Sequence, residues 1–490
     1  MNDINQKARR GIKLLFGRQI LLQIFTFAGG VVLARILTPA QFGLYAIATF
    51  LVALLAMIGD FGLAPSFIQR KEELTERDLC IGFTLQLILT TCIVVVLLIS
   101  APILAHFYPM APPETIWLIR ALALSLYLTS WRSMSALQLE RHLEYNRLAV
   151  IEVVEVVAFQ GTAVLLALMG LGVWSLVWAT LFRGVIGTSL VYMAAPWAIK
   201  LAYDKTIARE ILRFGIPFQL QNIFNSASYW VTPTLVATFI GPQAVGYLTW
   251  ASSNGKKPLM LVDNVMRVSF PHLSRIQDDM AEVERILLRY LTFLLLASGV
   301  WFAVLCVAGH PLVYLIYSSK WTPAVPALVL YALCLQGDVV SFTVTVGLNA
   351  VGKVASVARI YAIRAIANIA LSIPLIFLMG FIAVPLVYAI VIAVTNLWLT
   401  SCLGIRATFR MISGLAWIIV PTAGSIIAGS LVLRLFSSPA LQAVSSAIIS
   451  FLVYALIAIL IGPEWARETI KSKVRRQLAG ISAKAAAALE

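Results

Sequence analysis

The feature that most constrains this chain is a series of long apolar segments, separated by short polar connections, along almost its whole length. A helix needs about 20 apolar residues to cross the hydrocarbon core of a bilayer. Hydrophobic residues make up 60% of the 490 residues and charged residues 12%, whereas a soluble domain is about half apolar and about a quarter charged. The sequence therefore predicts an all-α polytopic membrane protein.

We expect about fourteen membrane-spanning helices of this length. They begin near residues 15, 42, 80, 115, 150, 172, 213, 245, 287, 323, 356, 381, 411 and 440. The connections on both sides of the membrane are short, so the chain has no room for a soluble catalytic or ligand-binding domain.

The net charge of +15 predicts membrane topology rather than nucleic-acid binding. If the N-terminus is cytoplasmic, almost all basic residues of the connections fall on the cytoplasmic side, and Lys320 and Arg434 lie in the outer connections. Such a bias sets the orientation of membrane proteins. We therefore expect both termini in the cytoplasm and an even number of spans. The basic tail after Arg467 is expected to contact the headgroups of anionic membrane lipids.

A motif before the second expected span recurs about 200 residues later, which indicates an internal repeat. The sequence "ILTPAQFGLYA" begins at Ile36 and "FIGPQAVGYLT" begins at Phe239, and each places a proline and a glycine four residues apart. An even number of spans separates the two copies, so both have the same orientation. They predict a parallel pseudo-twofold axis along the membrane normal.

The repeat predicts two six-helix lobes, residues 1–205 and 206–408, around a central cavity. Two extra C-terminal helices follow at 409–465. The basic cytoplasmic tail, residues 466–490, ends in "AAALE", which we interpret as an expression-vector scar. Two lobes around a cavity are suited to alternating access by rocking.

The stretch Ser252–Pro271, "SSNGKKPLMLVDNVMRVSFP", places charges where a membrane span is expected. As one continuous helix it brings Lys256, Asp263 and Arg267 to one side, which must face protein or a water-filled cavity. Asp263 and Arg267 can neutralise each other as an ion pair. Lys256 and Lys257 have no acidic residue within a turn. We expect these lysines to bind an anion such as a pyrophosphate, unless they extend to the membrane surface or the span lies elsewhere.

Polar side chains also follow one face of the first and seventh expected spans at helical spacing. We expect them to line the cavity: Gln19, Gln23, Gln219, Asn222, Ser226 and Tyr229. Arginines in other spans, or at their ends, either bind the anion, form structural pairs or anchor the helix at the interface: Arg35, Arg183 and Arg364.

Carboxylates inside the spans are candidates for ion coupling, because a buried carboxylate readily exchanges a proton. Three residues carry this prediction: Asp60, Asp263 and Asp338. For Glu152 and Glu155 we expect a structural pair with Arg147 at a helix end instead. No cofactor or metal site is expected, because the five cysteines and four histidines are dispersed.

With these motifs, the chain resembles the polysaccharide transporter family of the multidrug/oligosaccharidyl-lipid/polysaccharide exporter superfamily. The likeness is to Wzx-type flippases, particularly the colanic-acid type. Five stretches carry it: "VLARILTPAQFGLYA" (Val32–Ala46), "GDFGLAPSFIQRKE" (Gly59–Glu72), "LQLERHLEYNRLAVIE" (Leu137–Glu152), "SFPHLSRIQDD" (Ser269–Asp279) and "KWTPAVP" (Lys320–Pro326).

The resemblance implies a flippase for undecaprenyl-pyrophosphate-linked oligosaccharide repeat units, which moves them from the cytoplasmic to the periplasmic leaflet of a bacterial inner membrane. Exopolysaccharide or lipopolysaccharide biosynthesis follows, through separate polymerase and export proteins. The resemblance implies an ion gradient as the energy source, without covalent chemistry or ATP. It also implies functional residues at motif positions: Arg35, Asp60, Arg70, Arg183 and Arg267.

Three other functions would each need a sequence feature different from those found here. A cation-coupled multidrug exporter of the same superfamily would need an acidic cavity for cationic drugs, whereas the cavity predicted here is basic. A membrane enzyme, such as a polymerase or glycosyltransferase, would need a long catalytic loop outside the membrane. A structural scaffold of an export complex has no feature in its favour.

Overall fold

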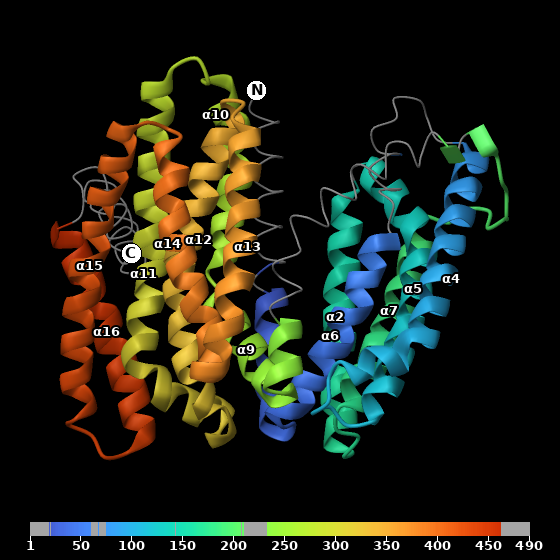
Figure 1. The fold of residues 1–490 in the computed structure, drawn as a ribbon, viewed down its shortest axis with the longest axis horizontal. Coiled ribbons are helices and arrows are strands. Elements are labelled where there is room, and N and C mark those ends of the chain that lie inside the picture. Colours follow the sequence, from blue (N-terminus) through green and yellow to red (C-terminus); the bar gives the residue numbers. More distant parts are fainter. Residues whose placement is uncertain are drawn as a thin grey trace, which may run out of the picture. The chain divides into compact units, whose positions relative to one another are not determined.

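The computed structural model describes residues 19, 21–59, 67, 75–142, 144–206, 208–209 and 233–461. Within these residues all regular secondary structure is helical (Figure 1). The helices are Leu21–Ile36, α2 (Pro39–Gly59), α4 (Glu76–His106), α5 (Glu114–Arg141), α6 (Tyr145–Leu168), α7 (Trp174–Ala194), α9 (Pro242–Gly255), α10 (Leu259–Arg275), α11 (Met280–Tyr317), η1 (Ser319–Ala324), α12 (Val325–Ala350), α13 (Val354–Met379), η2 (Gly380–Ile382), α14 (Ala383–Ser401), α15 (Ile405–Leu433) and α16 (Pro439–Ile461).

Eight helical segments in the described part of the chain are long and apolar enough to cross a membrane. In lipid, a helix satisfies all of its backbone hydrogen-bonding groups internally, which explains why these apolar runs are helical. The prediction of an all-α polytopic membrane protein is confirmed. Most of the span expected near residue 213 lies outside the described residues, so the count of fourteen stays a prediction.

Side-chain caps set the first residue of two long helices. At the start of α4, the Thr75 hydroxyl accepts a hydrogen bond from the Asp78 backbone N–H, and the Asp78 carboxylate accepts one from the Thr75 N–H. At the start of α11, the Asp279 carboxylate accepts hydrogen bonds from the backbone N–H groups of Ala281 and Glu282. Each cap satisfies backbone donors that the first helical turn leaves without an internal partner.

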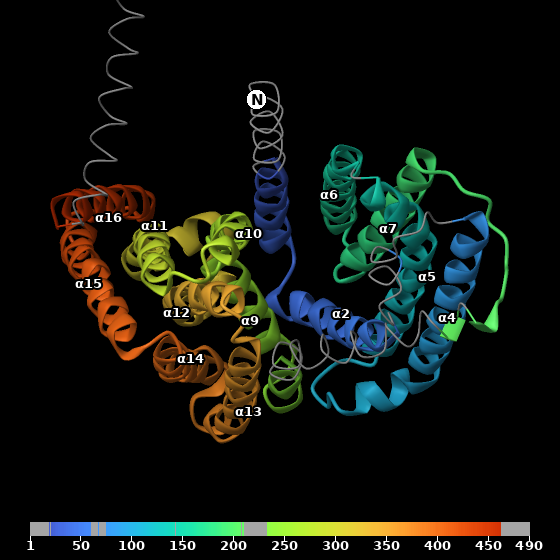
Figure 2. The ribbon, with the colours of Figure 1, turned by 90° about the horizontal axis from the view of Figure 1, so that it is seen from above.

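The chain divides into two compact units, and unit 1 comprises residues 1–249 with 376–381. Its central helix is α5, which packs against α2, α4, α6 and α7 (Figure 2). One apolar cluster includes Phe67, Phe83, Met134 and Trp197. A second cluster joins helix Leu21–Ile36 to α6 and α7. Unit 1 therefore has its own hydrophobic core.

Unit 2 comprises residues 250–375 with 382–490. Its long helix α11 packs against α10, α12, α15 and α16, and α12 packs in turn against α10 and α14. The core between these helices is aliphatic and includes Leu287, Leu291, Leu335, Val339 and Leu348. Helix α12 is the best buried of the candidate spans, so polar residues on α12 are held inside protein rather than in lipid.

The two copies of the repeated motif lie against each other within unit 1. Pro39 begins α2 and Pro242 begins α9, and proline is well tolerated in the first turn of a helix. Gly241 has a φ of +105°, a conformation that glycine adopts without a steric penalty. Residues 376–381 join this region through aromatic contacts, Phe377 with Phe239 and Phe381 with Tyr247.

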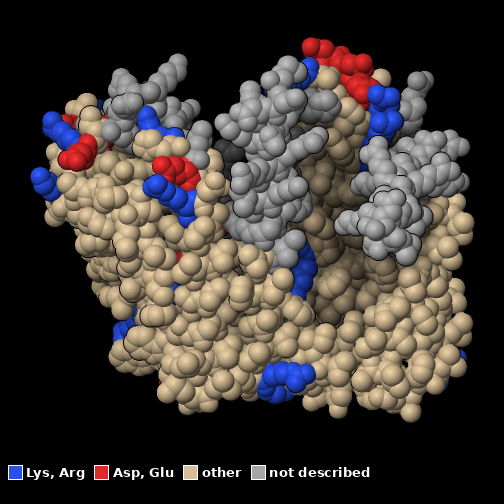
Figure 3. Space-filling model, turned by 180° about the vertical axis from the view of Figure 1, so that it is seen from behind, with Lys and Arg blue, Asp and Glu red and all other residues tan. Residues whose placement is uncertain are grey.

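Charged side chains gather mainly toward one end of the helices in each unit, and uncharged residues cover most of the surface between the ends (Figure 3). Many large hydrophobic side chains are exposed along these helices. The basic residues that the topology prediction assigns to the cytoplasm include helix-terminal ones: Arg77 in the first turn of α4, Arg141 at the end of α5, Arg275 at the end of α10 and Arg285 near the start of α11. A band of apolar surface is what a membrane requires of the helices that cross it.

Candidate functional site

Residues 256–258 form a turn between α9 and α10, so the prediction of one continuous helix through Lys256 and Arg267 is wrong. The signal for the break is Pro258, because proline has no backbone N–H and its ring clashes with the carbonyl four residues earlier in a helix. Lys256 therefore does not share a helix face with Asp263, which is exposed on α10.

The break is supported by contacts with neighbouring helices. A Cβ atom on Gly255 would lie 2.9 Å from the carbonyl oxygen of Leu328 and 2.9 Å from Cβ of Tyr331, so only glycine allows this approach to α12. The Gly255 carbonyl accepts a hydrogen bond from Trp301 Nε1 of α11 at 3.1 Å. These contacts fix the position of the residue that follows, Lys256.

Lys256 forms a buried ion pair with Asp338 of α12. Its Nζ lies 2.8 Å from Asp338 Oδ2, and the two side chains are 15% and 7% exposed. Within a membrane protein, a charged side chain is costly unless another charge or a polar group compensates it. Asp338 supplies the acidic partner that Lys256 lacks among its neighbours in the sequence.

Two tyrosines complete the surroundings of this ion pair. The Tyr388 hydroxyl of α14 donates a hydrogen bond to Asp338 Oδ1 at 2.5 Å. Lys256 Nζ lies 4.1 Å from the centre of the Tyr388 ring and 5.6 Å from that of Tyr331. Both distances are within the range of cation–π attraction. The ammonium group is thus held by a carboxylate and two aromatic faces.

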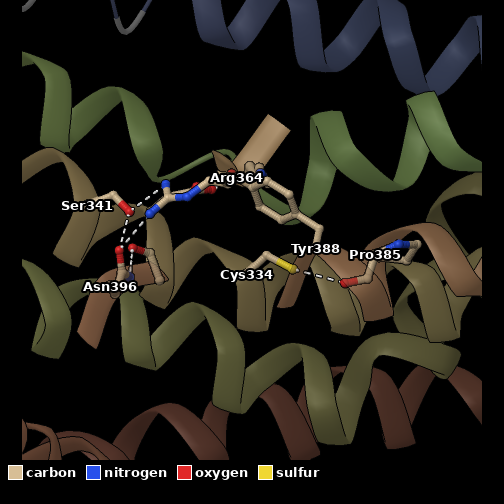
Figure 4. A network of polar contacts seen from close by, with 9 residues as sticks. Cys334, Ser341, Arg364, Pro385, Tyr388 and Asn396 are labelled. Carbon is tan, nitrogen blue, oxygen red and sulfur yellow. Dashed lines mark hydrogen bonds and ion pairs between the residues drawn. The ribbon is translucent and has the colours of Figure 1, made fainter. Parts of the chain in front are cut away.

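Arg364 of α13 lies in a network of neutral oxygen acceptors (Figure 4). Its side chain is buried, with 6% exposed. Nε donates to Thr395 Oγ1 at 2.8 Å, Nη1 to Ser341 Oγ at 3.0 Å and Nη2 to Asn396 Oδ1 at 3.0 Å. The guanidinium also lies 4.8 Å from the centre of the Tyr361 ring. No acidic side chain in the described part of the chain forms an ion pair with it.

The two groups belong to one polar face in the interior of unit 2. Asp338 and Ser341 are three residues apart on α12, so their side chains lie on the same side of that helix. Ser341 donates to Asn396 Oδ1 at 2.6 Å, and Asn396 Nδ2 donates to the Gly337 carbonyl at 2.9 Å. This face therefore brings together two cations and one carboxylate, with neutral hydrogen-bonding groups between them.

Unit 1 contains a second cluster, centred on Glu155 of α6. Its side chain is 2% exposed and forms ion pairs with Arg132 of α5 and Arg183 of α7. The Arg183 Nε to Glu155 Oε2 distance is 3.6 Å, and the Arg183 side chain is 48% exposed. A Cβ atom on Gly187 would overlap the Glu155 carboxylate. The glycine therefore provides the space for the carboxylate between α6 and α7.

The prediction that Glu155 pairs with Arg147 is wrong. Arg147 pairs with Glu144 at 3.0 Å, in an exposed contact within one helical turn. The charges that neutralise Glu155 come from two other helices, which a search for partners nearby in sequence could not find.

Other predicted residues are described, but the structure leaves their role a prediction. Gln19 is partly buried, whereas Gln23 and Arg35 are exposed along the first described helix. Lys257 lies beside Lys256 in the turn and is partly buried.

Several predicted residues lie outside the described residues. They are Asp60, Arg70, Gln219, Asn222, Ser226 and Tyr229, together with the side chain of Arg267.

Sequence reasoning missed Arg132, Tyr388 and Asn396. A signal existed for Arg132, since an arginine inside an expected span is by default a functional candidate. For Asn396 the signal was an amide side chain inside an apolar span. For Tyr388 no such signal exists, because tyrosine is a common packing residue and its role depends on its partner from another helix.

Both clusters consist of cationic side chains around a buried carboxylate. Guanidinium and ammonium groups bind carboxylates and phosphates through charge-assisted hydrogen bonds. Among the described residues, no group of three or more histidine, cysteine, aspartate or glutamate side chains could hold a metal ion. The arginine and lysine side chains of both clusters are thus of the chemical type that binds anions.

Two curated relatives resemble this chain over part of its length. The succinoglycan biosynthesis transport protein ExoT of Rhizobium meliloti (strain 1021) is 25% identical over 312 residues, which cover 62% of this chain and 61% of the relative. The lipopolysaccharide biosynthesis protein WzxC of Escherichia coli (strain K12) is 27% identical over 319 residues, 62% of each chain. The matched region thus spans about six-tenths of the length of these relatives.

Solved structures show the same fold. The lipid II flippase MurJ in an inward closed conformation superposes with a TM-score of 0.74 at 17% identity, over 94% of this chain and 100% of that one. An inward-facing MATE family multidrug transporter has a TM-score of 0.59 at 17% identity, over 81% and 96%. At this identity the likeness establishes the fold alone.

The model of one protein family matches residues 32–326, which is more than half of the chain. All five stretches that carry the resemblance lie within this range, which begins at Val32 and ends at Pro326. The chain therefore belongs to the polysaccharide biosynthesis protein family.

Proposed function

We propose that this protein translocates a lipid-linked oligosaccharide with an anionic diphosphate head group across the membrane, for the biosynthesis of a surface polysaccharide. The substrate class is an undecaprenyl-pyrophosphate-linked repeat unit, moved from the cytoplasmic to the outer leaflet. The observation that carries the proposal is an excess of positive charge. In each unit, a buried carboxylate is accompanied by two cationic side chains, Arg132 and Arg183 in one and Lys256 and Arg364 in the other.

Arg183 is the side chain best suited to receive the head group. It is half exposed, and among the described residues its polar contact is with Glu155 through Nε. The two Nη atoms therefore remain to donate hydrogen bonds. A guanidinium presents its donors in a fixed fork that matches the oxygens of a phosphate. Glu155 would hold Arg183 in place without cancelling the charge of both arginines.

The comparisons support this proposal. The two relatives are described as a succinoglycan biosynthesis transport protein and a lipopolysaccharide biosynthesis protein. The solved structure that shares the fold over almost the whole chain is described as a lipid II flippase. A diphosphate with several sugars cannot cross about 30 Å of hydrocarbon unaided, so a membrane path lined with donors meets the need of such a substrate.

Further parts of the proposal follow from the sequence. The protein would lie in a bacterial inner membrane with both termini in the cytoplasm, and the lobes 1–205 and 206–408 would alternate in access. A gradient of ions, most simply of protons, would drive the cycle, with Asp263 and Asp338 as the described candidates for coupling. No covalent step is part of the proposal, and polymerase and export proteins would act on the product.

A leaflet assay in proteoliposomes tests the proposal. A diphosphate-linked oligosaccharide lipid is placed in the inner leaflet, and its appearance outside is followed with a sugar-modifying enzyme. We expect transport by the wild type and a loss of about tenfold or more with Arg183→Gln, which removes a charge-assisted contact. Arg434→Gln is the matched control, because it removes one exposed arginine at the end of α15.

One result would contradict the proposed function, and another would contradict only the role given to Arg183. If the wild type moves no diphosphate-linked lipid but exports small organic cations, the protein is a drug exporter. If Arg183→Gln and Arg434→Gln transport as well as the wild type, the flippase activity stands but the cluster at Glu155 is structural.

A further inference from the structure

The surroundings of Lys256 Nζ are those of a binding site for a monovalent cation. The Asp338 carboxylate contacts it through Oδ2 at 2.8 Å, and the rings of Tyr388 and Tyr331 lie at 4.1 and 5.6 Å. A carboxylate together with aromatic faces is how proteins recognise ammonium groups. Here the cation is part of the chain, delivered by the turn between α9 and α10.

We propose that the Lys256 ammonium occupies a monovalent-cation site formed by Asp338, Tyr388 and Tyr331 whenever the Asp338 carboxylate is ionised. Asp338 consequently binds no inorganic cation in the native protein. Removal of the ammonium group opens the site to a small cation from solution, such as sodium, potassium, ammonium or a short alkylammonium ion.

The contacts that hold Asp338 and Tyr388 in place indicate that the cation site is formed independently of Lys256. Tyr388 donates to Asp338 Oδ1, which leaves Oδ2 directed at the cation. The Cys334 thiol of α12 donates to the Pro385 carbonyl at 3.4 Å and ties α12 to α14 beside the pair. Asp338 and Tyr388 therefore come from two helices that are held together independently of Lys256.

The helix break keeps the ammonium in place. Gly255 packs against α12, and its carbonyl accepts from Trp301. The Lys256 backbone N–H remains bonded to the Ser252 carbonyl at 3.0 Å. Because the backbone on both sides of Lys256 is anchored, its side chain reaches Asp338 from a fixed point. A tethered cation of this kind has little translational freedom left to lose on binding.

Replacement of Lys256 by alanine should convert this arrangement into a site for a soluble cation. The variant leaves a buried carboxylate next to two aromatic faces and the space of an aminopropyl group. A buried carboxylate without a counter-charge strongly favours binding a cation. Propylammonium matches the atoms removed and is the most specific probe.

Thermal unfolding of the purified full-length protein in detergent measures this binding. Sodium, potassium, ammonium and propylammonium chloride are each titrated against N-methyl-D-glucamine chloride at constant ionic strength. We expect Lys256→Ala to show a saturable rise in Tm of about 2 to 5 °C with at least one of these cations. The wild type and Lys256→Ala/Asp338→Asn should show no saturable rise. Lys257→Ala is the matched control, since it removes the neighbouring lysine of the same turn and should not respond.

Two outcomes overturn the proposal. One is a folded Lys256→Ala protein whose Tm is insensitive to every cation tested. The other is a wild type that responds saturably to sodium or potassium and loses this response with Asp338→Asn. If the Lys256→Ala protein unfolds during purification, the purification is repeated with each of the same cations present in every buffer. Recovery of folded protein with them supports the site, and failure with all of them contradicts it. Thermal unfolding measures cation binding and not transport. A failure of the flippase assay therefore leaves this test of the cation site unchanged.

Discussion

Gly43 and Gly246 occupy equivalent places in the two copies of the repeated motif, and each faces the backbone of the other copy. A Cβ atom on Gly43 would overlap the carbonyl oxygen of Pro242, and one on Gly246 would overlap the carbonyl oxygen of Pro39. The contact is reciprocal, as a twofold relation between the two motifs requires. Each helix can approach the other only because both residues lack a side chain.

Alanine at either glycine should therefore be destabilising to a similar degree. We expect Gly43→Ala and Gly246→Ala each to lower the free energy of unfolding by about 1 to 3 kcal/mol, the usual effect of inserting a methyl group into a packed contact. Denaturant titration in detergent measures it. Gly161→Ala is the control, because nothing lies within 4 Å of its Cβ position in α6. A neutral result at Gly43 would show that the two helices separate easily.

Glu155→Gln should destabilise unit 1. The change leaves Arg132 and Arg183 without their shared counter-charge, and because these arginines are 27% and 48% exposed, we expect a cost of about 1 to 3 kcal/mol. Glu144→Gln removes one carboxylate from an exposed pair with Arg147 and should cost about 0 to 1 kcal/mol. Equal effects of the two variants on the unfolding midpoint would contradict the interpretation that the buried Glu155 carboxylate stabilises unit 1 through its two ion pairs.

Tyr388→Phe separates the two roles of this tyrosine. It removes the hydrogen bond to Asp338 but keeps the aromatic ring that faces Lys256. We expect a loss of about 1 to 3 kcal/mol in the free energy of unfolding, because a buried charged acceptor loses its donor. Tyr388→Leu, which removes the ring as well, should lose more. Identical unfolding curves for the two variants would mean that the ring contributes nothing.

Arg364→Lys should not preserve the network around Arg364. The three acceptors Thr395, Ser341 and Asn396 are each reached by a different nitrogen of the guanidinium, whereas lysine offers a single ammonium on a flexible chain. Two acceptors would lose their donor, at a cost of about 1 to 3 kcal/mol each. The unfolding midpoint checks this. A lysine variant as stable as the wild type would show that water or rearrangement replaces the lost contacts.

The membrane fold could be predicted from the sequence because the rule behind it is local. An apolar run of sufficient length must be helical in lipid, whatever its neighbours are. The break at Pro258 was also readable from the residue itself, but the charges around it were interpreted as one helical face instead. Pro258 lies between Lys256 and Asp263, and a helix break at this proline means that the two residues do not share one continuous helix.

The ion pairs could not be predicted in the same way. Lys256 meets Asp338, and Glu155 meets Arg132 and Arg183, only because helices distant in the sequence pack side by side. Sequence spacing defines which residues share a face of one helix, but it does not define which faces meet. Polarity inside a span therefore indicated where buried polar contacts form, whereas the identity of the partner required the structure.

The guanidinium of Arg364 has a consequence for the electrical behaviour of the protein. Its acceptors are neutral, so its hydrogen bonds are satisfied while its unit charge is not cancelled by them. An elementary charge that moves across the full membrane potential gains or loses about 2.3 kcal/mol per 100 mV. Any step that carries α13 along the membrane normal would therefore move charge through the field. The rate of such a step would depend on voltage, and its reversal would produce a measurable current even with no ion transported.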